Sequence, residues 1–324
     1  MGIHSTLTLK AMHKTKLTTL KTNSMKKIAL LSLLAFAYCA KAQQDPQYTQ
    51  YMYNMNVINP AYAGSTESLS FGLLYRNQWT KIDGAPETGT FFGHSRIGNN
   101  MGLGLSVIAD QIGPVKETNV YADFSYTVKL GGEHNLAFGL KAGATFHDIG
   151  LANIALINPN DPFFLNINET TPNIGAGVFY YSDKYYLSVS VPNMLSSVHL
   201  SQNGNNIGSE TQHYFVSGGY VFDLSANTEL KPSFLIKSAF EAPTSFDINL
   251  NVRFYKKFEI GASYRLDDSF SGLINFAISP SLRIGYAYDA VSSDINAFAP
   301  ASHEVMLLFD LNFSKRASRS PRYF

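Results

Sequence analysis

The sequence predicts an all-β fold, a transmembrane antiparallel β-barrel of about 14 strands with an N-terminal periplasmic or lumenal segment. From Leu69 onward apolar and polar side chains alternate with a period of two residues, and no useful stretch has a helical period. The alternating runs last about 8 to 14 residues, which is longer than most strands of soluble sheets. Short and long connections between them also alternate. Together these features favour a membrane barrel over a soluble sandwich.

Composition excludes several other classes of protein. Only 15% of the 324 residues are charged, whereas 13% are aromatic and 24 are glycine. The one long apolar run lies near the N-terminus and is too short for a membrane helix, so a helical membrane protein is excluded. A single cysteine, Cys39, excludes a disulfide scaffold. The strong alternation excludes a coiled coil and a disordered chain.

A secretory signal peptide is predicted at residues 25–42. Met25 begins a segment with two lysines, an apolar core and the small-residue site Ala40-Lys41-Ala42, so cleavage is expected between Ala42 and Gln43. Residues 1–24 are interpreted as the result of a start codon assigned too far upstream, with Met25 as the true initiator. The mature chain then has 18 basic and 24 acidic residues, which disfavours a nucleic-acid partner. Cys39 leaves with the signal peptide.

The barrel itself is predicted over residues 68–313. In one of its strands Leu136, Phe138, Leu140 and Phe146 form the apolar face, and Lys141 lies on the polar face. The predicted strands start near residues 68, 88, 101, 117, 134, 173, 184, 211, 228, 244, 257, 270, 281 and 303. Connections after even strands are tight, and the longest connections, 148–172, 192–210 and 290–302, follow odd strands. Short turns are typical of the periplasmic side of an outer-membrane barrel and long loops of its outer side.

Two segments flank the barrel. Residues 43–67 are polar and aromatic without clean periodicity, and a lumen of about 14 strands is too wide for wall side chains to fill. We therefore expect this segment to fold into or across the periplasmic mouth; a mobile leader is the alternative. The residues expected to pack in the lumen are Tyr48, Tyr51, Tyr53, Asn59, Pro60 and Tyr62. The tail 314–324 is basic, and it is either a solvated end or a periplasmic docking peptide that uses Arg316, Arg319, Arg322, Tyr323 and Phe324.

Charged side chains on the polar faces are expected to point into the lumen, because a basic side chain facing lipid costs about 2–4 kcal/mol near the membrane midplane. These candidates are Asp123, Lys129, Lys141, Asp247, Arg253, Glu259, Arg265 and Arg283. They would pair across the lumen or bind the N-terminal segment; lining a channel is the alternative. Arg76 and Trp79 are expected at the extracellular rim, where Gly84 and Pro86 make a turn. Trp79 is predicted to anchor the barrel at the membrane interface, and a contact with exported cargo is the alternative role.

Two opening motifs and the last strand resemble a known family. QDPQYTQYMYNMNVINPAYAGS at 44–65, YRNQWTKIDGAPET at 75–88 and SHEVMLLFDLNF at 302–313 are similar to segments of the PorP/SprF family. The resemblance implies an outer-membrane protein of Bacteroidota associated with the type IX secretion system. It further implies a part in secretion or surface anchoring of a cognate adhesin-like cargo, including adhesins for gliding motility. The implied partners are cargo with a C-terminal sorting domain, other secretion components and outer-membrane lipid.

The residues predict no enzyme and no cofactor. The mature chain has no metal-ligand spacing of histidines, and Gly102 and Gly104 lie in a strand without the following helix that a dinucleotide loop requires. An outer-membrane hydrolase is a weak rival, because no Ser–His pair is selected by spacing. The main alternative function is a plugged outer-membrane transporter or porin for small hydrophobic solutes.

Overall fold

The structure is a computed structural model, and it describes residues 46–150, 166–195, 198–202, 205–209, 212–239, 242–299 and 301–311. All of them belong to the compact unit Gln43–Phe324. The signal peptide, the cleavage site at Ala42 and Gln43, and the basic tail lie outside the described residues, so these remain predictions. No helix among the described residues is long and apolar enough to span a membrane.

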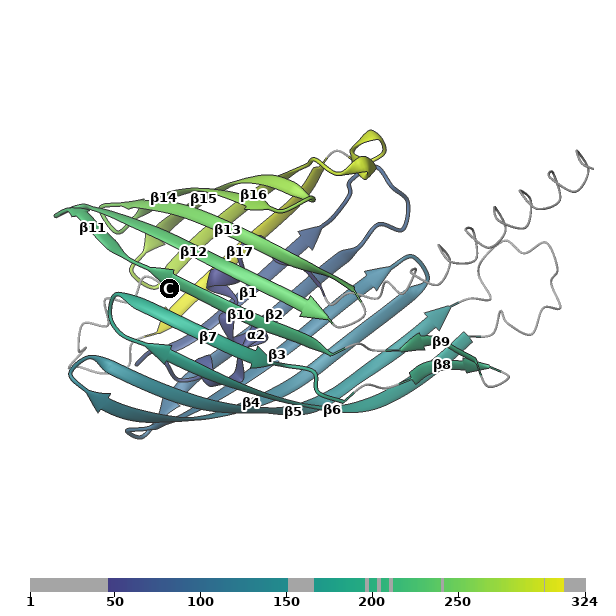
Figure 1. Ribbon diagram of the computed structural model, residues 1–324, viewed down its shortest axis with the longest axis horizontal. Helices are drawn as coiled ribbons and strands as arrows, with labels where there is room; N and C mark the ends of the chain where they lie inside the picture. The colour runs from purple at the N-terminus through teal and green to yellow at the C-terminus, as the bar shows by residue number, and fades with distance from the viewer. Residues whose placement is uncertain are drawn as a thin grey trace, which may run out of the picture. The chain divides into compact units, whose positions relative to one another are not determined.

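The barrel wall is built from long antiparallel strands (Figure 1). Their bounds are β1 Leu69–Asn77, β2 Glu87–Ile97, β3 Met101–Ile112, β4 Val115–Gly131, β5 His134–Gly150, β6 Asn166–Tyr181, β7 Tyr185–Val191, β10 His213–Tyr220, β11 Phe222–Ser225, β12 Thr228–Ala239, β13 Ala242–Phe254, β14 Phe258–Arg265, β15 Ser269–Ser279, β16 Leu282–Val291 and β17 Ala301–Leu311. Two further strands, β8 Val198–Gln202 and β9 Asn205–Ser209, pair only with each other in a hairpin between β7 and β10.

The sheet closes on itself at two pairings that join distant parts of the chain. β1 pairs with β17 along its whole length, and β10 bridges β7 and β12. β10 and β11 both pair with β12 and together occupy one position in the wall. Within the described residues the wall therefore has 14 positions, which confirms the predicted closed barrel. Closure pairs the first strand with the last, so no strand of the described barrel wall is a free edge strand, as hydrocarbon requires.

Alternation along each strand separates a lipid-facing surface from the lumen. In β5, Phe138, Leu140 and Phe146 are exposed on the outside, whereas Lys141 and Thr145 are buried inside. The same pattern continues in the neighbouring strands, where β4 places Phe124 and Tyr126 outward. The predicted assignment of faces is thereby confirmed for these strands.

The connections also alternate as predicted, with tight turns at one end of the barrel and the longest loops at the other. Tight turns follow β2, β4, β6, β11, β13 and β15, and they mark the periplasmic end of the barrel. The opposite, extracellular end carries the longer connections, including the β8–β9 hairpin and the 3₁₀ helix Asp294–Ala297 before β17. One predicted boundary was wrong: β6 begins at Asn166 rather than near 173, because residues 166–172 continue the ladder with β5 beyond the expected strand end.

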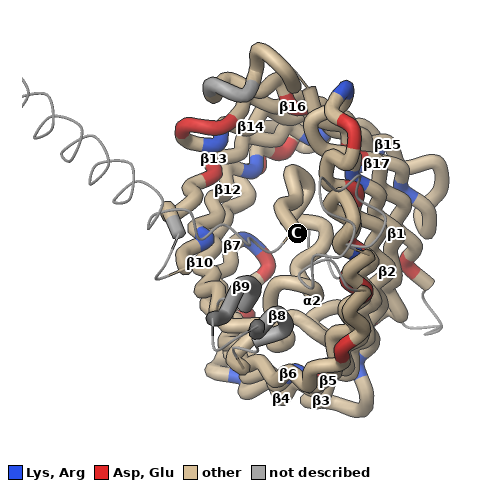
Figure 2. The backbone as a smooth tube through the Cα atoms, turned by 90° about the vertical axis from the view of Figure 1, so that its right-hand side faces the viewer, with Lys and Arg blue, Asp and Glu red and all other residues tan. Residues whose placement is uncertain are grey.

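The segment before β1 folds into three short helical turns inside this wall (Figure 2). These are η1 Tyr51–Tyr53, α2 Met55–Ile58 and η2 Pro60–Tyr62. Asn59 ends α2 and caps η2, since its side-chain carbonyl accepts a hydrogen bond from the Ala61 backbone N–H at 2.9 Å. We call residues 46–67 the N-terminal segment.

Candidate functional site

The N-terminal segment runs along the lumen and contacts wall residues over most of the barrel's depth. At its start, the Tyr48 hydroxyl bonds Thr90 at 3.0 Å in the extracellular half of β2. At its end, the Gly64 N–H donates to His94 Nδ1 at 3.3 Å, nearer the periplasmic end of the same strand. The segment is expected to fold into or across the periplasmic mouth, and it reaches from there into the extracellular half of the lumen. The N-terminal segment has no sequence periodicity, so the sequence does not show how deep into the lumen it reaches.

The six residues expected to pack in the lumen all lie within the barrel. Tyr48, Tyr51, Asn59 and Pro60 are buried, and Tyr53 and Tyr62 are half-buried. The Tyr51 hydroxyl donates to Ser233 Oγ at 3.3 Å and accepts from Asn249 Nδ2 at 3.1 Å. Tyr62 packs edge-on against Phe179, with ring centroids 5.3 Å apart.

On one side the segment lies directly against glycines of the wall. A Cβ added to Gly139 in β5 would meet the Ala61 nitrogen at 2.0 Å. A Cβ added to Gly177 in β6 would meet Asn59 Oδ1 at 2.0 Å. Asn59 Nδ2 also donates to Ser188 Oγ at 2.7 Å and to the Val178 carbonyl at 3.0 Å. The two glycines thus let the wall approach the backbone of Pro60 and Ala61 and the side chain of Asn59 closely.

Facing the extracellular half, a buried ion cluster holds the start of the segment. Arg76 of β1 lies 2.7 Å from Asp289 of β16 and 3.2 Å from Glu304 of β17. The Glu304 carboxylate accepts the backbone N–H groups of Thr49 and Gln50 at 2.9 and 2.8 Å. The Thr49 hydroxyl contacts Asp289 as well. We call Arg76, Asp289, Glu304 and Thr49 the Arg76 cluster.

Arg265 joins a second charged pair to the same part of the segment. Its guanidinium binds Asp247 with two hydrogen bonds of 2.8 and 3.0 Å, which is the bidentate geometry of a strong charge-assisted contact. The same guanidinium donates to Gln47 Oε1 at 3.1 Å and to the Tyr48 carbonyl at 3.5 Å. Arg265 therefore links β13 and β14 to the N-terminal segment.

Toward the periplasmic half, Tyr53 lies among charged wall residues. Its hydroxyl donates to Glu259, whose second oxygen lies 3.4 Å from Arg283. Burial, reinforced by the negative charge of Glu259, raises the pKa of Tyr53 well above its ordinary value. The phenol therefore stays protonated as a donor. The ammonium group of Lys231 lies 4.7 Å from the centroid of the Tyr53 ring.

A third charged pair contacts the middle of the segment. Lys141 lies 3.3 Å from Asp123, its direct neighbour on β4, and donates to the Val57 carbonyl at 3.1 Å. Asn56 Nδ2 donates to Asp123 at 3.1 Å. Elsewhere Arg253 pairs with Glu229 across β12 and β13. Of the eight predicted lumenal charges, Asp123, Lys141, Asp247, Arg253, Glu259, Arg265 and the half-buried Arg283 lie in such pairs.

Lys129 is exposed near the periplasmic end of β4, where it has the same inward parity as Asp123, and it remains a predicted lumenal charge. One predicted position needs correction. Arg76 does not lie at the rim: only 2% of it is exposed, since its parity on β1 matches the inward Leu74. Trp79 is half-buried, and Pro86 is buried, whereas Gly84 is exposed in the connecting loop.

Sequence reasoning also missed Asp289, Glu304 and Lys231, which are buried contacts of the segment. Asp289 has the same parity as the predicted Arg283 on β16. Period-two counting would therefore have found it. Glu304 stands directly opposite Arg76 in the β1–β17 ladder. This pairing can be recognised only when the closure of the barrel and the register of the two strands are known.

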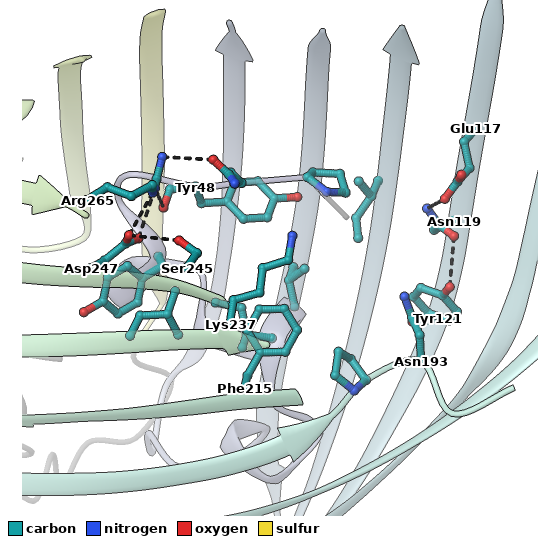
Figure 3. Close-up of a pocket in the computed structure, with 18 residues that line it drawn as sticks. Tyr48, Glu117, Asn119, Tyr121, Asn193, Phe215, Lys237, Ser245, Asp247 and Arg265 are labelled. Atoms are coloured by element: carbon teal, nitrogen blue, oxygen red, sulfur yellow. Dashed lines mark hydrogen bonds and ion pairs between the residues drawn. The ribbon is translucent and has the colours of Figure 1, made fainter. Parts of the chain in front are cut away.

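Above the N-terminal segment lies an open cavity on the extracellular side (Figure 3). The cavity itself measures about 60 Å³, and about 710 Å³ once the gaps between side chains and the part open to solvent are counted. Tyr51, Val57 and Ile58 of the segment line it together with wall residues from β3, β4, β10 and β12 to β14. Charged groups, among them Lys237 and the Arg265–Asp247 pair, also line it. We call this space the outer cavity.

Comparison with known families agrees with this architecture. Residues 40–309 match the family described as type IX secretion system membrane protein PorP/SprF. The chain belongs to the PorP/SprF family. The match covers both opening motifs and most of the closing strand, so the family resemblance inferred from these motifs is confirmed. PorP/SprF membership and the closed barrel together place the protein in the outer membrane as a multi-pass β-barrel.

Solved structures show the same fold at low sequence identity. The CymD monoaromatic hydrocarbon channel is 13% identical with a TM-score of 0.50, and the match covers 80% of this chain and 92% of that one. The Ralstonia pickettii toluene transporter TbuX is 10% identical with a TM-score of 0.50, over 80% of this chain and 93% of that one. No curated protein sequence matches the chain.

In this PorP/SprF barrel, charged and polar side chains of the wall contact the N-terminal segment. In the described part of the chain no cluster of three or more His, Cys, Asp or Glu side chains is placed to hold a metal ion. The arrangement of charges holds a chain segment inside the lumen and leaves the outer cavity above it.

The direction of the N-terminal segment in the lumen predicts from which side of the outer membrane its first residues can be reached. A Gln47→Cys variant is expected to react with a membrane-impermeant maleimide on intact cells, because Gln47 lines the outer cavity and is only half-buried. Once Cys39 is removed with the signal peptide, the introduced thiol is the only one. An Asn99→Cys control in the β2–β3 turn should react only after the outer membrane is permeabilised. Labelling of Gln47→Cys only after permeabilisation would contradict the assigned direction.

Proposed function

We propose that the protein is a non-enzymatic accessory component of type IX secretion that supports secretion or surface anchoring of a cognate adhesin-like cargo. The observation that carries the proposal is the lumen filled by the N-terminal segment through the Arg76 cluster and the other ion pairs. A lumen occupied in this way suits a binding module better than a diffusion pore. The cargo would carry a C-terminal sorting domain, and other secretion components would be neighbours. Binding would use the extracellular loops, especially 148–172 and 192–210, together with the loop 78–86 that holds Trp79, Gly84 and Pro86.

The rival function is a plugged transporter for small hydrophobic solutes. Its support is the fold that the chain shares with CymD and TbuX, which are a monoaromatic hydrocarbon channel and a toluene transporter. At 10 and 13% identity these likenesses concern the fold alone. Family membership therefore favours the accessory role. The tail residues Arg316, Arg319, Arg322, Tyr323 and Phe324 remain a proposed periplasmic docking peptide.

Deletion of the gene should abolish surface display of one protein with a distinctive C-terminal domain. The measurement is a quantitative comparison of surface and medium proteins between the deletion strain, the parent and the complemented strain. Total expression of the missing protein should be unchanged, which separates a display defect from a synthesis defect. An unchanged surface proteome together with reduced uptake of toluene would overturn the accessory role in favour of the transporter.

A further inference from the structure

We propose that the extracellular part of β6, at Asn168 and Thr170, binds an extended segment of the exported protein as an added β-strand. This inference rests on the proposed function, because the added strand would belong to the cargo. It names the surface that the cargo would contact and the kind of chain that this surface accepts, which is a short extended segment with a basic side chain opposite Glu169.

β6 is much longer than the strand that follows it. Its whole length, Asn166–Tyr181, pairs with β5, whereas β7 pairs with it only over Ala176–Tyr181. The chain after β7 follows the same edge a little further, since the Met194 N–H donates to the Ile174 carbonyl at 2.8 Å. The next two strands, β8 and β9, pair only with each other. No strand among the described residues therefore covers the edge of β6 on the extracellular side of Ile174.

The backbone groups of Asn168 and Thr170 point toward this uncovered edge. In an antiparallel ladder the N–H and C=O of one residue face one neighbouring strand, and those of the next residue face the other. The Ile174 carbonyl faces away from β5, because it accepts from Met194. Residues of the same parity present their backbone groups to the same side. Asn168 and Thr170 each offer a donor and an acceptor there, whereas Pro172 offers only an acceptor.

These two residues lie at the extracellular boundary of the membrane. On the outward face of β3 to β6, exposed polar side chains stand directly opposite one another: Gln111, Lys116, Asp148 and Asn168. Nearer the periplasm, Pro172 stands in an apolar row with Val107, Val120 and Ala144. A free N–H is costly in hydrocarbon, and proline removes that donor where the apolar surface begins. Beyond this row, water can satisfy the backbone groups until a partner strand replaces it.

The side chains of this edge define the strand that fits it. Asn168 and Thr170 are exposed on the outer face, and Glu169 between them is half-buried on the lumenal face beside His147 of β5. No described lysine or arginine forms an ion pair with Glu169. A basic residue directly opposite on the added strand would supply this charge, because cross-strand pairs of opposite charge are favourable. Uncovered strand edges are templates for another chain, which is the basis of peptide recognition by strand addition.

Proline substitution tests the edge without removing a bond of the wall. Thr170→Pro deletes an N–H that faces away from β5, and Thr170→Val is the matched control that keeps this N–H. The readout is surface display of the protein that disappears from the surface in the deletion strain. Thr170→Pro should lower its display about tenfold, since one donor is lost and the ring holds the added strand away, whereas Thr170→Val should display it normally. Asn168→Pro and Asn168→Val form a second pair, used if the heat-dependent gel mobility shows that Thr170→Pro fails to fold.

Hydrogen exchange on the purified full-length barrel in detergent shows whether the edge is free. The amides of Asn168 and Thr170 should exchange about a hundredfold faster than those of Ile167 and Glu169, which face β5. Slow exchange at both residues would overturn the proposal, because the chain's own loops would then cover the edge; slow exchange that is lost on dilution would assign the edge to a second copy instead. Equal cargo display by Thr170→Pro and Thr170→Val would also overturn it. A deletion strain that loses no surface protein would refute the proposed function itself.

Discussion

Replacing Gly139 by valine is expected to displace the N-terminal segment from the lumen. A Cβ at this position would lie 2.0 Å from the Ala61 nitrogen and 2.4 Å from the Pro60 carbonyl carbon, so the side chain and the segment cannot both keep their places. The contacts are backbone atoms, which cannot swing away as a flexible side chain can. Extra atoms in a densely packed interior typically lower the free energy of unfolding by about 1–3 kcal/mol. A clash with backbone atoms belongs to the upper part of this range.

Displacement is measured with a reporter thiol. Ser65→Cys is nearly isosteric at a position only 2% exposed, so it should resist maleimide in the parent and react rapidly when combined with Gly139→Val. Sensitivity of cells to vancomycin should rise in parallel. Gly272→Val is the matched control, because a Cβ at Gly272 in β15 meets no atom within 4 Å. Continued protection of Ser65→Cys in the Gly139→Val variant would show that the segment does not pack against β5 as described.

Loss of the Arg76 guanidinium is the second change with a large expected effect. Arg76→Met would leave Asp289 and Glu304, at 1% and 0% exposure, without the cation that both contact. Removing one partner of a buried ion pair typically costs about 3–5 kcal/mol, because the remaining charge stays desolvated. The thermal unfolding of the barrel, followed by gel mobility after heating, should move to markedly lower temperature.

A double variant provides the control for this effect. Arg76→Met combined with Glu304→Gln removes one of the stranded carboxylates and should recover part of the lost stability, although Thr49 and Gln50 would still lose a charged acceptor. Arg76→Lys should be intermediate, since an ammonium lacks the planar fork that reaches two carboxylates. Unfolding of Arg76→Met at the parent temperature would mean that the Arg76 cluster contributes nothing to the fold.

Much of the barrel could be predicted because its main determinant is local. Alternation of lipid-facing and lumenal residues needs only neighbouring sequence, and it placed Phe138 outside and Lys141 inside. Cross-strand pairs such as Asp123–Lys141 and Asp247–Arg265 follow once the register of adjacent strands is known. Arg76–Glu304 could not be foreseen in this way, because the two residues meet only where β1 closes on β17.

The candidate site was harder to predict than the wall. Residues 46–67 have no repeating pattern that reports their depth, so the contacts of Tyr48 with Thr90 and of Gly64 with His94 emerge only from the assembled barrel. The role of Gly139 was equally hidden, since a glycine in a strand indicates a close approach without naming the partner. Arg76 adjoins a loop in the sequence, which predicts a rim position, but its parity on β1 turns its side chain into the lumen.

Ion conductance of the purified wild-type barrel in a planar lipid bilayer tests the central claim most directly, which is that the N-terminal segment closes the lumen. The account predicts no steady current for the wild-type protein and an open, ohmic conductance for Gly139→Val recorded under the same conditions. A stable conductance of the wild-type barrel, equal to that of the variant, would contradict it.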